Sequence, residues 1–224
     1  MRLVLCLFIV LNSFFLKPAM AQTGVSERLL INAEITARKL LNNENFSDTR
    51  DMLRRSRAVI IVPNFYRGGF ILGAAGGTGV ILAKDNSGTW GYPGFVNMGS
   101  LSAGLQIGFS GAELIVFVIT NEGLSSIINN QVRIGGNAGL SVATFGGDVG
   151  GAKGLTTDAD YIIYAKSAGL YAGLSLEGSV IEARPDIARD FYGEPAALYP
   201  ILIDKKYTDS RADKLRDVLV QPQQ

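Results

Sequence analysis

Glycine constrains this chain more than any other residue. Most of its 27 glycines fall between residues 68 and 181, inside segments whose other residues favour β-strands. Glycine normally weakens a strand, because it adds no side chain to pack and loses much backbone freedom. So many glycines in strand-like segments need a physical reason, such as tight curvature or the close approach of another backbone, sheet or ligand. We therefore predict a curved, glycine-rich β-sheet over residues 58–183.

Helical patterns flank this β-rich region on both sides. The apolar residues between 24 and 57 recur at three-to-four-residue spacing, which predicts an amphipathic helix and a second, shorter one. The stripe consists of Leu29, Leu30, Ala33, Ala37, Leu40 and Leu41. Short helices are also predicted at 121–128 and within 185–220, where Pro185 occupies a first-turn position that accepts proline. The predicted class is α+β: a curved, mostly antiparallel, barrel-like sheet with helices at both ends.

Two turn signals divide the predicted sheet. The apolar run 59–62 is expected to be a buried strand that ends at Pro63, because proline cannot donate a hydrogen bond to a neighbouring strand. Residues 85–88 (DNSG) predict a hairpin loop. A strand is expected to follow, with Trp90 and Tyr92 on the same side of it.

The first 21 residues have the pattern of a secretory signal peptide. Arg2 supplies a positive start, residues 3–16 are almost wholly apolar, and residues 19–21 (AMA) match an A-x-A cleavage site. The alternative is a membrane anchor, but the apolar run is shorter than the roughly 20 residues that a spanning helix needs. We therefore expect an exported protein, periplasmic or extracellular, whose residues 22–224 form one domain.

Composition removes several classes of chemistry. The chain has no histidine, and its one cysteine, Cys6, lies within the expected signal peptide. Histidine-dependent general bases, Ser-His-Asp triads, thiolate nucleophiles and thiol-based metal sites are thereby excluded from the expected mature protein, and no cofactor is expected. The glycine runs lack the residue order of a nucleotide-binding loop. A formal net charge of +1 gives no general basic excess for binding nucleic acid.

A carboxylate-based hydrolase remains as an alternative. Glu177 is set among small and apolar residues, and a glycosidase-type site would pair it with a second carboxylate. The simpler interpretation is an exposed glutamate, or one paired with a nearby arginine such as Arg184, since carboxylates are mostly exposed unless they are paired. We favour a protein that is not an enzyme.

A cluster of arginines is the strongest candidate for a binding site. Five of them, with one acid, Asp51, lie within eighteen residues: Arg50, Arg54, Arg55, Arg57 and Arg67. On a helix, Arg50, Arg54 and Arg57 would share one face. Basic residues beside exposed apolar ones suit anionic lipid surfaces. The alternative is a solvated helix face whose arginines pair locally with acids.

Trp90 and Tyr92 form a second candidate. Amphipathic aromatic side chains suit the interface of a membrane with water. They suit the core of a domain equally well. The sequence leaves both interpretations open.

The segment 161–193 carries a further signal. Its centre, residues 169–179 (GLYAGLSLEGS), interleaves small and large apolar residues around one carboxylate, and it resembles the signature of the SYLF family at Gly173, Ser175, Glu177 and Gly178. Other weak motifs follow in the family's order. They are 57–63 (RAVIIVP), 76–80 (GGTGV) with Trp90 and Pro93, 104–108 (GLQIG), Arg184 with Asp186, and 191–193 (FYG). The resemblance covers roughly residues 30–195.

This resemblance implies a function and partners. SYLF domains bind phosphoinositides or other anionic phospholipids, and in eukaryotic members a basic amphipathic N-terminal helix contacts the membrane. In this chain, region 24–43 is only weakly basic, with Arg28, Arg38 and Lys39 against two glutamates. Actin binding is known in the yeast branch, many bacterial members are exported, and this chain resembles an exported bacterial member with a single domain. We therefore expect a peripheral membrane protein of the cell envelope. The alternative is a structural or interaction protein of the envelope that forms homo-oligomers through its glycine-rich sheet.

Overall fold

The computed structural model describes most of the chain after residue 23. The described residues are 24–46, 48–69, 72–103, 108–129, 132–133, 142–146, 159–168 and 179–220. Eight strands in these ranges form one sheet in the order β5-β8-β3-β2-β1-β4-β7-β6. They are β1 Ala58–Gly69, β2 Leu72–Ala83, β3 Gly94–Ala103, β4 Gly108–Val118, β5 Val132–Arg133, β6 Val142–Gly146, β7 Tyr161–Ala168 and β8 Val180–Ala183. Every neighbouring pair is antiparallel except β6 and β7.

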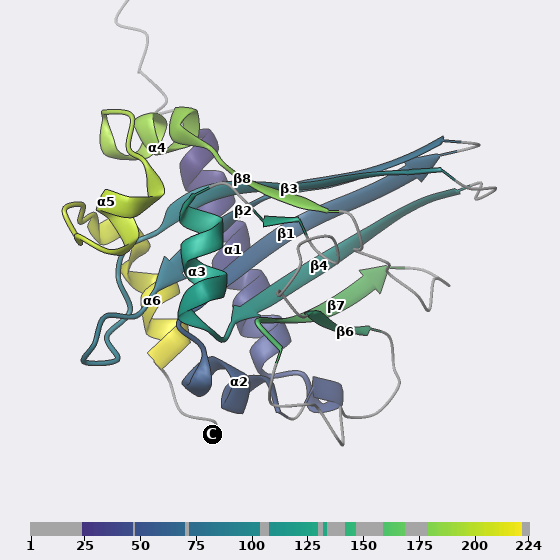
Figure 1. Ribbon diagram of the computed structural model, residues 1–224, viewed down its shortest axis with the longest axis horizontal. Helices are drawn as coiled ribbons and strands as arrows, with labels where there is room; N and C mark the ends of the chain where they lie inside the picture. The colour runs from purple at the N-terminus through teal and green to yellow at the C-terminus, as the bar shows by residue number, and fades with distance from the viewer. Residues whose placement is uncertain are drawn as a thin grey trace, which may run out of the picture.

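The helices come mainly from the two ends of the described chain. They are α1 Val25–Leu41, α2 Thr49–Arg55, α3 Asn121–Ile128, α4 Pro185–Tyr192, α5 Leu198–Leu202 and α6 Asp213–Val220, with short 3-10 turns at Glu44–Phe46 and Ser210–Ala212. Figure 1 shows them gathered at one end of the curled sheet, with α1 behind the strands and α3 in front. The predicted α+β class, with a curved and mostly antiparallel sheet, is confirmed. The short helices predicted at 121–128 and from Pro185 onward are confirmed too.

The core lies where the helices cover the sheet. In β1, the four residues 59–62 are all at most 1% exposed, because helices cover both faces of the sheet there. The apolar stripe of α1 packs on this end, and its alanines, Ala33 and Ala37, have no exposed surface. Small side chains at these two positions let the helix lie close to β1 and β2. Beyond the helices, β1 to β4 project as a glycine-rich extension (Figure 1).

The sequence predicted that the first strand ends at Pro63, and this prediction is wrong. β1 continues to Gly69, and its pairing with both neighbours shifts register between residues 61 and 66. The shift is a β-bulge, one of the few places where a central strand accepts a proline. The bulge separates the buried half of β1 from the projecting half.

The bulge explains two of the glycines in β2. A Cβ atom on Gly77 would lie 2.3 Å from the backbone oxygen of Asn64, and one on Gly79 would lie 2.5 Å from that of Ile61. The bulged backbone of β1 therefore comes too close for any side chain at these positions. This is the close backbone approach that the glycine content predicted.

We expect Gly77→Ala to lower the free energy of unfolding by about 3 kcal/mol, because the added methyl must displace backbone. Urea denaturation of the purified variant measures the loss. Gly99→Ala on the neighbouring strand is the matched control, since its Cβ would meet nothing closer than 3.5 Å. Equal stabilities for the two variants would contradict the proposed role of the bulge.

Candidate functional site

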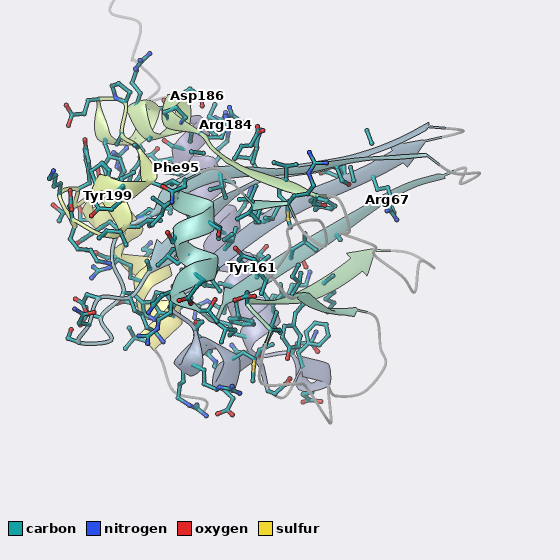
Figure 2. All side chains as sticks on the ribbon, in the orientation of Figure 1. Arg67, Phe95, Tyr161, Arg184, Asp186 and Tyr199 are labelled. Carbon is teal, nitrogen blue, oxygen red and sulfur yellow. The ribbon has the colours of Figure 1, made fainter. Side chains whose placement is uncertain are left out.

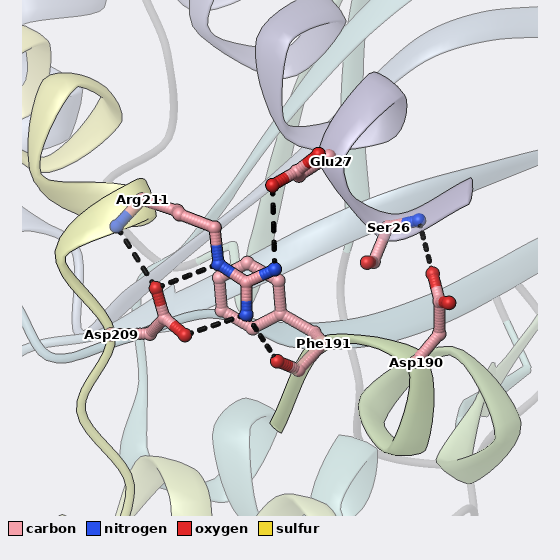
Figure 3. A network of polar contacts seen from close by, with 6 residues as sticks. All are labelled: Ser26, Glu27, Asp190, Phe191, Asp209 and Arg211. Carbon is pink, nitrogen blue, oxygen red and sulfur yellow. Dashed lines mark hydrogen bonds and ion pairs between the residues drawn. The ribbon is translucent and has the colours of Figure 1, made fainter. Parts of the chain in front are cut away.

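The N-terminus of α1 is fixed by a residue from α4. Residue Gly24 precedes the helix and offers no side-chain cap. Instead, the backbone N–H of Ser26 donates to the Asp190 carboxylate over 2.9 Å, as Figure 3 shows. This hydrogen bond lowers the pKa of Asp190, and the carboxylate also complements the positive end of the helix dipole. A residue 164 positions later in the chain thus caps the first helix.

Arg211 ties the same end of α1 to the C-terminal segments. Its guanidinium pairs with Asp209 at 2.7 Å and with Glu27 of α1 at 3.4 Å. It also donates to the backbone oxygen of Phe191 and lies 4.3 Å from the centre of that residue's ring (Figure 3). The hydrogen bonds to Asp209 are the main reason that the pKa of Arg211 is raised. α1 is thus held firmly against the domain, with one long face left outward.

The outward face of α1 combines aliphatic and basic side chains. We call it the outer face of α1 and define it by Val25, Arg28, Ile31, Asn32, Ile35, Arg38 and Lys39, the exposed residues of this helix. Its three aliphatic side chains are 52–56% exposed. The two glutamates of the helix, Glu27 and Glu34, are only partly exposed, and each pairs with an arginine. The exposed positions of this helix therefore carry no acid, although the sequence of the helix contains two glutamates.

Arg50 does not belong to an exposed arginine face. It is 7% exposed and donates to the backbone oxygen of Val218 at 3.1 Å and to the Asn42 side chain at 2.8 Å. Burial is the main reason that its pKa is lowered. Arg57 does not share a helical face with Arg50 and Arg54 either, because α2 ends at Arg55 and the chain is extended from residue 56 onward. Arg50 instead joins α2 to the end of α6.

Arg54, Arg55 and Arg57 do lie together at the surface. All three are exposed around the C-terminal end of α2, and Arg54 pairs with Asp51. Lys84 joins them, since its ammonium donates to the backbone oxygens of Leu53 and Arg54 at 2.6 and 2.8 Å. Burial, followed by the charge of Arg57, lowers the pKa of Lys84. These four residues form a compact basic cluster.

Arg67 is not part of that cluster. It lies on the projecting half of β1, and Figure 2 shows it well away from the helices. Ten residues of strand separate it from Arg57, which corresponds to roughly 33 Å. The arginines that are neighbours in sequence therefore occupy three separate places.

Trp90 and Tyr92 are set against the core. Trp90 is only 3% exposed and makes an isolated bridge to Lys84 in place of the expected strand. Tyr92 is partly buried, its hydroxyl donates to Asp213 at 3.2 Å, and Arg216 lies 4.2 Å from its ring centre. The sequence left open whether this pair meets a membrane or packs in the core. In the structure both residues pack against the core.

The family signature falls almost wholly outside the described residues. Gly173, Ser175, Glu177 and Gly178 all lie in 169–178, so the hydrolase alternative built on Glu177 has no described geometry. Near the signature, Arg184 pairs with Asp186 at 2.6 Å, as their labelled positions in Figure 2 illustrate. Arg184 and Thr78 both donate to the Asn97 side-chain oxygen, at 3.0 and 2.7 Å. This network borders a hollow of about 490 Å³ over bare glycine backbone.

Comparison with known proteins finds a family and several relatives. The family model described as "Ysc84: Las17-binding protein actin regulator" matches residues 99–221. "SH3 domain-containing YSC84-like protein 1" of Rattus norvegicus is 29% identical over 161 residues, 71% of this chain and 47% of that protein. "LAS seventeen-binding protein 3" of Saccharomyces cerevisiae is 30% identical over 172 residues, 75% of this chain and 37% of that protein.

The human counterpart of the rat protein is 29% identical over 154 residues, which make up 68% of this chain and 45% of that protein. This chain therefore spans less than half the length of these curated relatives. The names of the family and of the yeast relative refer to Las17 binding and, for the family, to actin regulation, and none of these names states an enzymatic activity. Among the described residues, no helix has both the length and the apolar character needed to cross a membrane.

Proposed function

We propose a function for this chain from its family. The chain belongs to the Ysc84 family, and its sequence resembles the SYLF signature. The proposed function is that of a non-enzymatic protein that binds anionic phospholipid surfaces. The observation that carries the proposal is the outer face of α1. Its exposed positions hold aliphatic and basic residues and one asparagine, and no acid. A helix of this kind lies in the plane of a membrane interface.

The physical argument has two parts. Burying half-exposed aliphatic side chains such as Ile31 and Ile35 in the interface removes apolar surface from water. Each arginine or lysine near an anionic surface adds about 1 kcal/mol. Because Asp190 and Arg211 hold the helix in place, little ordering of α1 is needed on binding.

We propose that this binding takes place outside the cytoplasm. The support is the signal-peptide pattern of residues 1–21, which predicts export. The lipid would then be an anionic phospholipid of the cell envelope, and the protein would associate with it peripherally.

Flotation with liposomes tests the proposed function. The purified protein is mixed with neutral phosphatidylcholine vesicles or with vesicles that contain anionic lipid, each at low and high salt. We expect flotation with anionic vesicles only, weakened by salt because the basic residues are exposed to screening. Absence of flotation on every anionic vesicle would overturn the proposal.

The basic cluster of Arg54, Arg55, Arg57 and Lys84 is a second surface in the same proposal. Changing its three arginines to glutamate should weaken flotation without unfolding the protein, since their side chains are exposed. Binding equal to that of the unchanged protein would restrict the proposal to α1.

Protein binding is the second candidate function, because the family description names Las17 binding and actin regulation. The projecting strands β1 to β4 offer a surface beyond the helices for an actin filament or for a second copy of the chain (Figure 1). Cosedimentation with actin filaments tests the first partner and light scattering tests the second. A monomer that stays in the supernatant would leave only the membrane proposal.

A further inference from the structure

A hollow of about 340 Å³ lies beside the C-terminal half of α1. Its lining combines residues of α1, β4 and β7 with residues from the bulged part of β1. The members used below are Lys39, Asn64, Tyr66, Gly111, Glu113 and Lys166. Four elements thus bring two lysines to one cavity, and neither the predicted arginine cluster nor the pair Trp90 and Tyr92 takes part.

The charges in this hollow do not balance. Lys39 pairs with Glu113 over 2.5 Å. Lys166 stands directly opposite Glu113 in the register of β4 and β7, so both side chains emerge on the same face of the sheet. Within the described part of the chain, Lys166 takes part in no ion pair, and it is exposed. One carboxylate between two ammonium groups leaves the hollow with a net positive charge.

Neutral hydrogen-bonding groups complete the lining. Tyr66 is 49% exposed and faces Gly111 in the register of β1 and β4. Its hydroxyl lies 3.4 Å from the side-chain oxygen of Asn64, which leaves the amide group of Asn64 able to donate. The Tyr66 hydroxyl donates to Asn64, so the donors left for a ligand are two ammonium groups and one amide, which suit an oxyanion in a cavity of this size.

We infer that this hollow binds the phosphate group of a phospholipid head group, an inference that rests on the proposed membrane function. The position of the hollow supports a lipid as the source. Ile35 lies one helical turn before Lys39, so the cavity opens at the edge of the outer face of α1. A phosphate at the membrane surface then reaches Lys39 and Lys166 while the aliphatic side chains contact the interface.

The two lysines give the site a preference for a phosphomonoester over a phosphodiester. A phosphomonoester carries close to two negative charges near neutral pH and three terminal oxygens. A phosphodiester carries one charge. Two lysines therefore favour phosphatidic acid over phosphatidylserine when vesicles of equal surface charge are compared.

The test uses Lys166→Gln, because Lys166 lies on β7 and outside the outer face of α1. Its matched control is Lys214→Gln, which removes an exposed lysine of α6. In flotation with phosphatidic acid vesicles, we expect Lys166→Gln to weaken binding about fivefold relative to the control. We also expect it to remove the preference over phosphatidylserine. If both variants bind phosphatidic acid vesicles equally well while the parent protein floats with anionic vesicles, the site is overturned. The proposed function then stays intact.

Removing the charge of Glu113 is expected to change vesicle binding in the opposite direction. Glu113→Gln releases Lys39 and should strengthen binding to phosphatidic acid vesicles severalfold. Glu122→Gln, at an exposed position of α3, is the control for the added net charge. Circular dichroism melting of each variant confirms that it folds. Weaker binding by folded Glu113→Gln would contradict the site.

Soluble glycerol 3-phosphate distinguishes the two sources of phosphate. We expect it to compete with phosphatidic acid vesicles at millimolar concentration and to do so only when Lys166 is present. Tight binding of glycerol 3-phosphate by a protein that floats with no vesicle would assign the hollow to a free phosphate compound and overturn the lipid assignment. In that case the proposed function fails as well, which the Lys166 comparison alone would not reveal.

Discussion

Replacing Ile31 and Ile35 together by glutamate is expected to abolish flotation with anionic vesicles and to leave the melting temperature nearly unchanged. Both side chains are more than half exposed, so the folded protein loses little packing. At the membrane, the double variant loses two aliphatic contacts and presents two carboxylates to an anionic surface. The combined effect is about 3 kcal/mol, or roughly a hundredfold in affinity.

A matched control separates the outer face of α1 from a general change of charge. Ile203→Glu with Val220→Glu also adds two carboxylates in place of exposed aliphatic residues, which are 43% and 69% exposed, but these lie just after α5 and at the end of α6. We expect this pair to retain most of the binding, with only the loss due to net charge. If both double variants lose binding equally, α1 is not the membrane-binding helix.

The second large effect concerns Arg50. Changing it to methionine should lower the free energy of unfolding by about 2–3 kcal/mol, because the Val218 oxygen and the Asn42 side chain lose their buried donor. For a chain of this size, the loss corresponds to roughly 5–10 °C in melting temperature. Thermal denaturation followed by circular dichroism measures it.

Arg55→Met is the control for Arg50, since Arg55 is exposed on the same short helix. We expect a change within about 0.5 kcal/mol for this surface substitution. Membrane binding gives the complementary result, because the folded Arg50 variant should float like the parent protein. An unchanged melting temperature for the Arg50 variant would show that its buried hydrogen bonds contribute no net stability.

These two arginines show why sequence alone could not define the site. Arg50 and Arg55 belong to one basic run, and nothing local distinguishes them. What buries Arg50 is the end of α6, whose Val218 lies 168 positions later in the chain. Long-range packing of this kind leaves no periodic signal. The same is true of Trp90, which is buried although no strand forms around it.

Local rules predicted much of the fold. The helix from Pro185 was found because proline at a first turn is a local signal. The apolar stripe of α1 was found because helical periodicity is local too. The bulge at Pro63 was missed, since it depends on pairing with both neighbouring strands. A signal for the outer face of α1 was present, because Ile31 and Ile35 are apolar residues that do not fit the buried stripe.

The contacts by which Asp190 and Arg211 hold the start of α1 have a consequence for biosynthesis. The helix that we propose to meet the membrane emerges early from the ribosome, yet its cap, Asp190, and its anchor, Arg211, are translated long afterwards. Until then, the buried stripe of α1 has only part of its partners, since α4 and α6 both pack against this helix. Newly made chains therefore carry an amphipathic helix with two uncovered sides. Premature association through these sides is open to the chain until synthesis has passed α6.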